Sequence, residues 1–191
     1  MIDPYLGPDD VLINRLGITS PDKLSQAEAD LSMVAMLRLS GQPLAGDYDL
    51  AHLQLFHRHI FGAVYPWAGE IRTVGIARTA NDVFCLPQHI EAFAADVFGQ
   101  LAAENELQGL TRQRFVERLA YYYGEIHALH PFREGNGRAQ RAFLRQLAGA
   151  AGWRLSWADL EPDTNDLASS ASLRGDLRPL TRMLDTLIRP K

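Results

Sequence analysis

The chain has 191 residues, a formal net charge of −4 and a pI near 5.8, with 47% hydrophobic and 22% charged residues. This composition is typical of one globular domain with a buried core, and we expect a single domain over residues 1–191. The acidic balance excludes the broad basic surface of a protein that binds nucleic acid directly, so any site for an anion must be local.

The single cysteine, Cys85, excludes an internal disulfide and, with only six scattered histidines, a structural zinc site of the usual spacing. Residues 1–20 contain Asp3 and Pro8 where a secretory signal needs a basic start and an unbroken apolar run. No apolar stretch reaches 18 residues. We therefore expect a cytoplasmic protein without membrane contact.

Apolar residues at helical spacing predict a mainly α-helical chain. The first helix follows Ser20 and carries Leu24, Ala27, Leu31, Val34 and Leu37 in one stripe. The other expected helices begin near residues 47–49, at Pro87, at Thr111 and at residue 137, followed by two short helices within 163–189 that break near Gly175. His52, His57 and His59 on the second helix are interpreted as surface or packing residues.

Two short segments rich in Ile, Val, Thr and Phe, Glu70–Ile76 and Asp82–Leu86, predict a β-hairpin with its turn at Ala77–Asn81. A lone hairpin is marginal in water unless something packs on it or adds a strand. The sequence leaves two roles open for it: a structural flap against the helices, or an exposed edge that binds a peptide by strand addition.

The segment between the fourth and fifth predicted helices contains the residues suited to chemistry, His130-Pro-Phe-Arg-Glu-Gly-Asn-Gly-Arg-Ala-Gln-Arg141. Pro131 disfavours helix at His130, so the preceding helix should end there. Gly135 and Gly137 allow backbone conformations closed to other residues. A glycine-containing loop that leads into a helix N-terminus presents free amides and the positive end of the helix dipole, which together favour phosphate.

The side chains of this segment suit a polyphosphate. Arg138, Arg141 and Arg145 lie on one face of the fifth helix, where paired guanidinium groups can hold phosphate oxygens. Glu134 would repel the anion unless Mg²⁺ lies between them. His130 is the loop residue whose ordinary pKa lies near neutrality, so we expect it to act as general base. His127 is interpreted as a packing or hydrogen-bonding residue.

The same residues resemble the signature of the Fic family, His-Pro-Phe-x-(Asp/Glu)-Gly-Asn-Gly-Arg-x-x-Arg, with every specified position filled. Upstream, Tyr65-Pro-Trp-Ala-Gly-Glu-Ile-Arg72 is similar to the segment that leads into the family's flap. The resemblance covers about residues 48–155, with helical extensions on both sides. It implies a mainly α fold, a helical bundle with a short β-hairpin flap over the active-site loop.

The resemblance implies an enzyme that transfers AMP from ATP to a hydroxyl group of a target protein, with pyrophosphate leaving. By this resemblance His130 deprotonates the hydroxyl and Glu134 holds Mg²⁺. The remaining motif residues bind the nucleotide: Gly135, Asn136 and Gly137 form the anion hole for the α- and β-phosphates, and Arg138 and Arg141 hold the β- and γ-phosphates. The target would dock along the flap, near residues 71–84.

Many Fic proteins contain an inhibitory helix with the pattern (Ser/Thr)-x-x-x-Glu-(Gly/Asn), and no Ser or Thr of this chain has Glu four residues later. The chain thus resembles stand-alone Fic toxins, in which a small antitoxin supplies the inhibitory glutamate to Arg141. Two alternatives stay open: a Fic-fold transferase with another phosphate-containing donor, and a non-catalytic module that binds a nucleotide or a partner. Gly137 disfavours the phosphotransfer subtype, which has Lys there.

Overall fold

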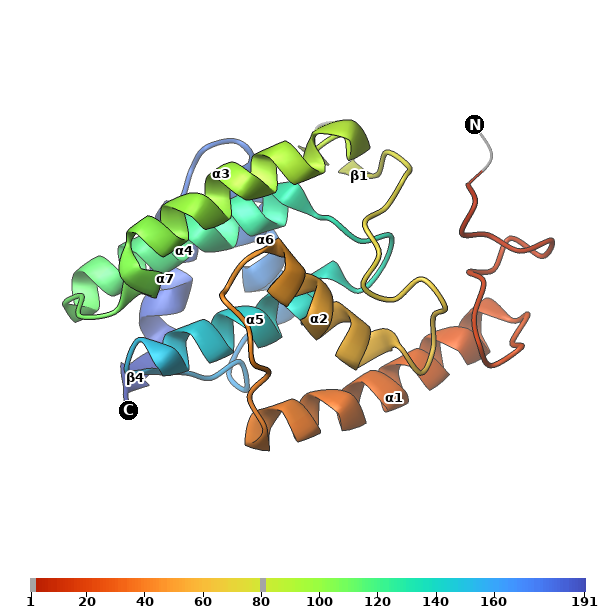
Figure 1. Ribbon diagram of the computed structural model, residues 1–191, viewed down its shortest axis with the longest axis horizontal. Coiled ribbons are helices and arrows are strands. Elements are labelled where there is room, and N and C mark those ends of the chain that lie inside the picture. Colours follow the sequence, from red (N-terminus) through yellow and green to blue (C-terminus); the bar gives the residue numbers. More distant parts are fainter. Residues whose placement is uncertain (1–2, 80–81) are drawn as a thin grey trace.

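The computed structural model of the protein describes residues 3–79 and 82–191 and is mainly helical (Figure 1). The α-helices are α1 (Pro21–Gly41), α2 (Leu50–Phe61), α3 (Ile90–Ala103), α4 (Arg112–Leu129), α5 (Asn136–Ala150), α6 (Pro162–Leu173) and α7 (Arg178–Leu187). Two short 3₁₀ helices, η1 (Pro87–His89) and η2 (Asn105–Leu107), flank α3. Within the described ranges, no helix combines the length and apolar character needed to cross a lipid bilayer.

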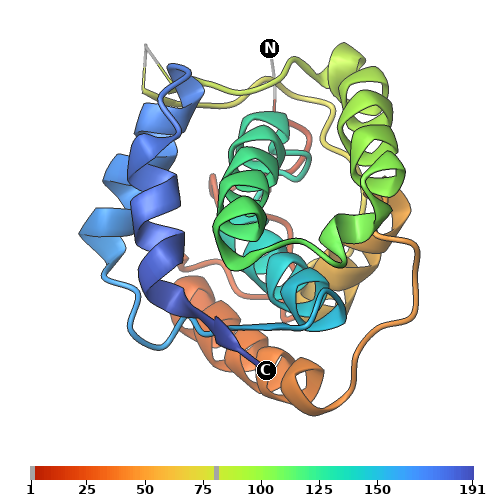
Figure 2. The ribbon, with the colours of Figure 1, turned by 90° about the vertical axis from the view of Figure 1, so that its left-hand side faces the viewer.

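Helix α4 forms the centre of the fold. It packs against α3 on one side and against α6 and α7 on the other, with α5 continuing from its end (Figure 2). Its buried side chains surround the helix axis: Phe115, Val116, Leu119, Ala120, Tyr122, Tyr123, Ile126, His127 and Leu129. A helix that is apolar on most sides is stable only inside a core. The loop that follows α4 therefore starts from a rigid element.

The helix ends follow the local signals in the sequence. Asp49 caps α2 by accepting a hydrogen bond from the amide of His52 at 2.7 Å, and the side chain of Thr111 accepts one from the amide of Arg114 at the start of α4. Pro21 and Pro87 stand in the first turns of α1 and η1, where a missing N–H costs little. The predicted helical segments are thus confirmed.

The first strand of the flap lies later in the chain than predicted. Strand β1 is Ala77–Thr79 and pairs antiparallel with β2, Asp82–Val83, whereas residues 70–76 form no strand. The earlier segment binds elsewhere, because the Arg72 amide donates to the carbonyl of Pro131 at 2.9 Å. Part of the predicted turn is therefore strand, and residues 80–81 lie outside the described residues.

A second small sheet was not predicted. Strand β3 (Trp153–Leu155) pairs antiparallel with β4 (Ile188–Pro190), so the end of the chain closes against the end of α5. Strands of three residues are too short to produce a recognisable alternation of polar and apolar side chains. This pairing also fixes α6 and α7, which lie between the two strands in sequence.

The flap is fastened to α6. The Asp82 carboxylate, which is buried, accepts hydrogen bonds from Ser170 at 2.6 Å and from Arg174 at 3.2 Å. On the neighbouring strand, Arg78 forms an ion pair with Asp166 at 2.7 Å. Both strands of the flap are thus held by the same helix, and the pair of strands does not rely on its own few hydrogen bonds.

Helix α1 faces the core with polar side chains. Glu28 and Ser32, one turn apart, are buried together with Leu24 and Leu39. Leu24 of the predicted apolar stripe is thus buried, but the later members point outward: Leu31, Val34 and Leu37 are 37%, 46% and 67% exposed. Periodicity predicts that a helix has an apolar face, but it does not decide which face meets the core.

A buried arginine joins the flap to the loop after α4. Arg72 is only 1% exposed, and its guanidinium donates to the carbonyls of His130 at 2.8 Å, of Val74 at 2.7 Å and of Cys85. Burial lowers the pKa of Arg72. The Cys85 amide adds a bond to the carbonyl of Ala128 at 2.9 Å. Both ends of the flap are therefore tied to the end of α4.

Replacing Arg72 with methionine should lower the free energy of unfolding by about 3 kcal/mol or more, because three buried carbonyls lose their donors. Urea unfolding of the purified chain measures this change. The matched control is Arg114→Met, at a surface ion pair with Glu117 on α4, which should change stability by about 0.5 kcal/mol at most. A loss below about 1 kcal/mol at Arg72 would contradict the assignment.

Candidate functional site

The loop between α4 and α5, residues 130–135, is closed by the side chain of Asn136, the first residue of α5. Helix α4 ends at Leu129, as Pro131 predicts, and His130 takes the left-handed conformation with φ 42°. The Asn136 side chain accepts from the amide of Phe132 at 2.9 Å and donates to its carbonyl at 2.7 Å. The side chain of Asn136 therefore shapes the loop, and only its backbone amide is available to an anion.

His57 supports the loop from α2. Its Nδ1 accepts from the Gly69 amide at 2.8 Å, and its Nε2 donates to the carbonyl of Glu134 at 2.8 Å. The ring stacks on Phe132 with centroids 3.9 Å apart, and burial lowers its pKa to about 4. Sequence reasoning left His57 among surface or packing residues, since a contact with a residue 77 positions away leaves no local signal.

The ring of His130 is neutral and is held in place by contacts with His127 and Phe84. Its Nδ1 lies 3.2 Å from the carbonyl of His127 and must donate to it, which leaves the lone pair on Nε2. The ring stacks on Phe84 of the flap at a centroid distance of 3.7 Å and an angle of 13°. Burial, followed by the neighbouring His127, lowers the pKa of His130 to about 3. The imidazole is neutral at physiological pH.

His127 lies one turn before His130 and faces the same cavity. Its ring meets that of His130 edge to face at 5.5 Å, and burial lowers its pKa to about 4. Its Nε2 is buried without a hydrogen-bond partner in the part of the chain that the structure describes. The ring contacts of His127 with Phe84 and His130 fit the expected packing role.

The N-terminus of α5 forms the anion end of the site. Gly135 has φ 80°, and a Cβ there would lie 2.4 Å from the ring of Phe61, so only glycine fits. The Glu134 carboxylate accepts from the Gly135 amide at 2.8 Å, as a phosphate oxygen would at a helix N-terminus. The amides of Asn136 and Gly137 belong to the first helical turn and have no acceptor within the helix.

The two arginines of the motif lie on the α1 side of this turn. Arg138 forms an ion pair with Glu28 and lies 3.8 Å from Glu134. Arg141 folds back toward the first turn, since a Cβ on Gly137 would lie 3.3 Å from its Nη1. Arg133, at the variable position of the motif, pairs with Asp3 at 2.9 Å and takes no part in this face.

The predicted site residues line two hollows, and Glu134 of one lies 3.8 Å from Arg138 of the other. One cavity, of about 640 Å³, is lined by His130, Glu134 and flap residues that include Arg78. The other, of about 470 Å³, is lined by Arg138, Arg141 and the outer turns of α1. A ligand that contacts both His130 and Arg141 must extend across the N-terminus of α5.

Glu134 fits a divalent cation only together with a ligand. Its side chain is 44% exposed, and the described residues contain no cluster of three or more His, Cys, Asp or Glu that could hold a metal. Mg²⁺ commonly takes one or two carboxylates and completes its shell with phosphate oxygens and water. The donor set therefore suits Mg²⁺ bound with a nucleotide rather than a resident metal ion.

The buried histidines should make the fold sensitive to acid. His57, His127 and His130 have pKa values lowered from 6.5 to about 4, 4 and 3, so the unfolded chain binds more protons below pH 6.5. The free energy of unfolding should therefore fall as the pH drops from about 6.5 toward 4. His127→Asn should reduce this slope by about one proton, or about 1.4 kcal/mol per pH unit.

Urea unfolding at pH 7, 6, 5 and 4.5 measures the slope, and the control is His59→Asn on the exposed face of α2. The control should keep the slope of the unaltered chain. Equal slopes for all three proteins would contradict the burial of an uncharged His127.

Comparison with known proteins places the chain in a family. A family model described as Fic/DOC matches residues 47–148, more than half of the chain. The protein adenylyltransferase VbhT of Bartonella schoenbuchensis is 38% identical over 188 residues, which are 98% of this chain and 38% of VbhT. The probable protein adenylyltransferase Fic of Escherichia coli K12 is 37% identical over 97% of this chain and 92% of that protein.

Solved structures agree over nearly the whole chain. BepC of Bartonella tribocorum with bound AMPPNP has a TM-score of 0.89 and 25% identity, over 98% of this chain and 97% of that one. The N-terminal Fic domain of a Bartonella quintana effector with bound ADP has a TM-score of 0.90 and 26% identity, with coverage of 98% and 95%. The predicted fold class is thereby confirmed, and the chain belongs to the Fic/DOC family.

Proposed function

We propose that this chain is a Mg²⁺-dependent protein adenylyltransferase that transfers AMP from ATP to a hydroxyl side chain of a target protein. The observation that supports this most directly is the neutral imidazole of His130, with its Nε2 lone pair free, in one cavity with Glu134 and the flap. The relatives named protein adenylyltransferases and the solved relatives with AMPPNP and ADP support the same reaction and donor.

In the proposed step, the target hydroxyl oxygen attacks the α-phosphorus of ATP. The new bond forms between that oxygen and phosphorus, the bond to the β-phosphate oxygen breaks, and pyrophosphate leaves with its electron pair. The hydroxyl proton passes to Nε2 of His130. Because phosphoryl-group chemistry depends mainly on alignment and charge stabilisation, the chain's contribution is to hold the two reactants in line.

The nucleotide would lie across the N-terminus of α5. The amides of Gly135, Asn136 and Gly137 would meet the α- and β-phosphates, because they start a helix and the dipole favours anions there. Arg138 and Arg141 would hold the β- and γ-phosphates on the α1 side. Glu134, with its exposed carboxylate, would hold Mg²⁺, which neutralises phosphate charge when bound.

The target protein would dock along the flap. Strand β1 is exposed at each of its three residues, and Val83 of β2 is 58% exposed. The flap also supplies Phe84, which stacks on His130, so a segment paired with the flap would lie next to the base. Strand addition gives alignment through backbone hydrogen bonds and leaves specificity to the side chains.

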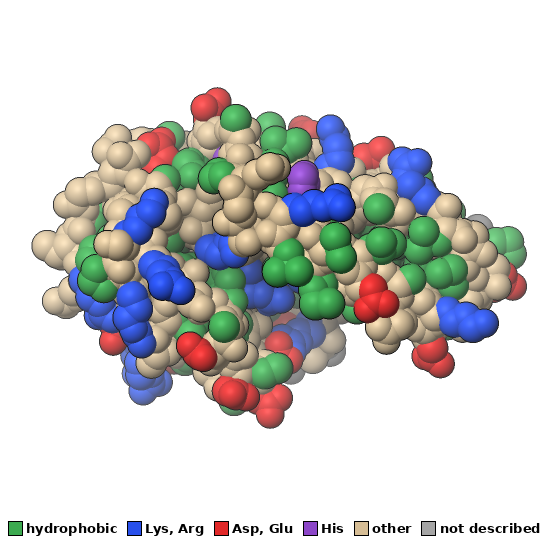
Figure 3. All heavy atoms as spheres, turned by 90° about the horizontal axis from the view of Figure 1, so that it is seen from below, with side chains coloured by type: hydrophobic (Ala, Val, Ile, Leu, Met, Phe, Trp, Pro, Cys, Tyr) green, Lys and Arg blue, Asp and Glu red, His purple; other side chains and the backbone are tan. Residues whose placement is uncertain are grey.

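The surface of α1 suits the binding of a small inhibitory protein. Such an antitoxin would make this chain the toxin of a toxin–antitoxin pair. Hydrophobic and basic side chains gather on the face that contains α1 (Figure 3). Its exposed apolar residues Met33 and Leu37 line the hollow that contains Arg138 and Arg141. An amphipathic helix with an acidic residue directed at Arg141 would match both the apolar and the cationic parts.

His130→Ala should abolish AMP transfer, with a loss of about 100-fold or more, while ATP binding stays within about twofold.

Arg141→Ala should weaken ATP binding about tenfold, because one charged phosphate contact is lost. The assay is incubation of the purified chain with α-labelled ATP, Mg²⁺ and a cell lysate, with calorimetry for binding and Arg114→Ala as control. Unchanged transfer by His130→Ala would contradict the proposal.

The same assay separates the other candidate functions. Transfer from another labelled donor, such as UTP, in place of ATP would identify a Fic-fold transferase with a different donor. Binding of Mg-ATP with no labelled product would identify a non-catalytic nucleotide-binding module.

The inhibitor proposal is tested in the organism of origin. Leu37→Glu, at an exposed residue of α1 that lines this hollow, should raise the amount of AMP-modified protein in cells several-fold, while the purified chain keeps its activity. Leu167→Glu is the matched control, because Leu167 is 73% exposed on α6, away from the α1 surface. Equal modification with both variants would contradict an inhibitor bound to α1.

A further inference from the structure

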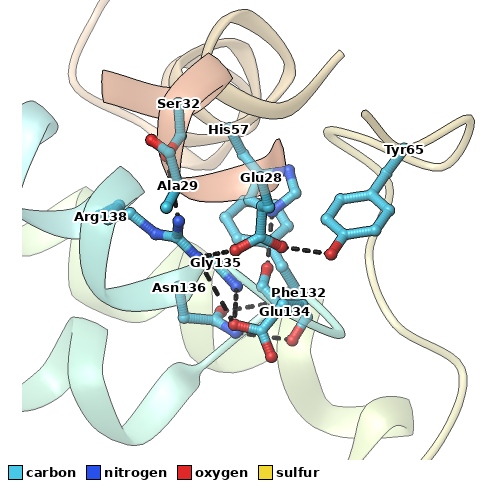
Figure 4. A network of polar contacts seen from close by, with 10 residues as sticks. All are labelled: Glu28, Ala29, Ser32, His57, Tyr65, Phe132, Glu134, Gly135, Asn136 and Arg138. Carbon is cyan, nitrogen blue, oxygen red and sulfur yellow. Dashed lines mark hydrogen bonds and ion pairs between the residues drawn. The ribbon is translucent and has the colours of Figure 1, made fainter. Parts of the chain in front are cut away.

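The buried carboxylate of Glu28 lies at the centre of a polar network between α1, α2 and α5 (Figure 4). Glu28 is 8% exposed and Ser32, one turn later, is 2% exposed. A carboxylate in such a place is costly unless its oxygens are paired. Both oxygens of Glu28 have partners, so the network as a whole accounts for its burial.

The partners of Glu28 come from two other parts of the chain. The Tyr65 hydroxyl donates to one oxygen, and Nη2 of Arg138, 110 residues away in sequence, donates to the other. Ser32 holds the same arginine: its Oγ accepts from Nη1 of Arg138 at 3.1 Å and donates to the carbonyl of Ala29. One edge of the guanidinium is therefore fixed by α1.

The face of the same guanidinium is fixed by α2. Its Cζ lies 4.7 Å from the ring centroid of Phe61, a cation–π contact, and Phe61 is fully buried. The Phe61 ring also packs against Gly135, where a Cβ would not fit. On the side of the loop, Oε1 of Glu134 lies 3.8 Å from Nη2. The fixed guanidinium thus lies directly beside the loop and the first turn of α5.

We propose that Glu28 is a positioning residue that fixes the guanidinium of Arg138 for the β-phosphate of a bound nucleotide. The inference rests on the proposed function, in which Arg138 is a phosphate ligand. A surface arginine samples many rotamers, and binding a phosphate must then restrict them. Glu28 and Ser32 restrict the side chain beforehand, and Tyr65 fixes Glu28 in turn.

The Glu28 carboxylate could either position Arg138 or compete with phosphate for it, and these two roles predict opposite effects of Glu28→Gln on ADP binding. If the carboxylate only competed with phosphate for Arg138, removing its charge would tighten binding of ADP. If it positions Arg138, the neutral amide loses the charge-assisted bond, and ADP binds more weakly. AMP has no β-phosphate, so its affinity should not depend on Glu28 in either case.

The experiment measures the affinities of AMP and ADP for the purified full chain by calorimetry. Glu28→Gln should weaken ADP binding about tenfold and leave AMP binding within about twofold. Tyr65→Phe, which keeps the carboxylate but removes its donor, should weaken ADP binding about threefold. The matched control is Asp30→Asn, which removes a carboxylate from the exposed face of the same helix and should change neither affinity.

Three results would overturn the role of Glu28. One is ADP binding that is unchanged or tighter in Glu28→Gln. Another is an equal loss of AMP and ADP binding in Glu28→Gln and Tyr65→Phe, which would mean that the network only stabilises the fold. The third is an unaltered chain that binds neither nucleotide, which would overturn the proposed function as well.

Discussion

The arrangement of the site depends on the buried guanidinium of Arg72. A buried cation normally requires a carboxylate, but the hydrogen bonds described for this one end on three backbone carbonyls, which belong to His130, Val74 and Cys85. Because these carbonyls come from the loop and from both ends of the flap, the side chain sets the distance between His130 and the flap that covers it. A lysine has one point of charge and could not span the three acceptors at once.

Around this centre, the motif residues are held by side chains outside the motif. His57 binds the carbonyl of Glu134, Phe61 packs on Gly135, and Glu28 binds Arg138. These contacts come from α1 and α2, whereas the motif lies on α5 and the loop before it. The chemistry of the site is therefore local in sequence, but its geometry requires helices that are brought together by folding.

This difference between local motif and distant support explains which parts of the fold and the site could be predicted from the sequence. Helix positions follow from periodicity and capping residues, and the loop after His130 follows from Pro131, because these signals act between neighbours. The first strand of the flap begins later than predicted because Arg72 binds the loop instead of a partner strand. The inward face of α1 and the role of His57 depend on contacts with residues 110 and 77 positions away, which no local pattern records.

The fastening of the flap to α6 has a consequence for where the functional unit ends. The family model stops at residue 148, yet the Asp82 carboxylate is held by Ser170 and Arg174, which come after it. Asp82 in turn precedes by two residues Phe84, the ring that stacks on His130. Helix α6 and its C-cap residue are thus part of the support of His130, although they contain no residue of the motif. A substitution on this face of α6 can therefore change how the flap lies on His130 without altering the motif.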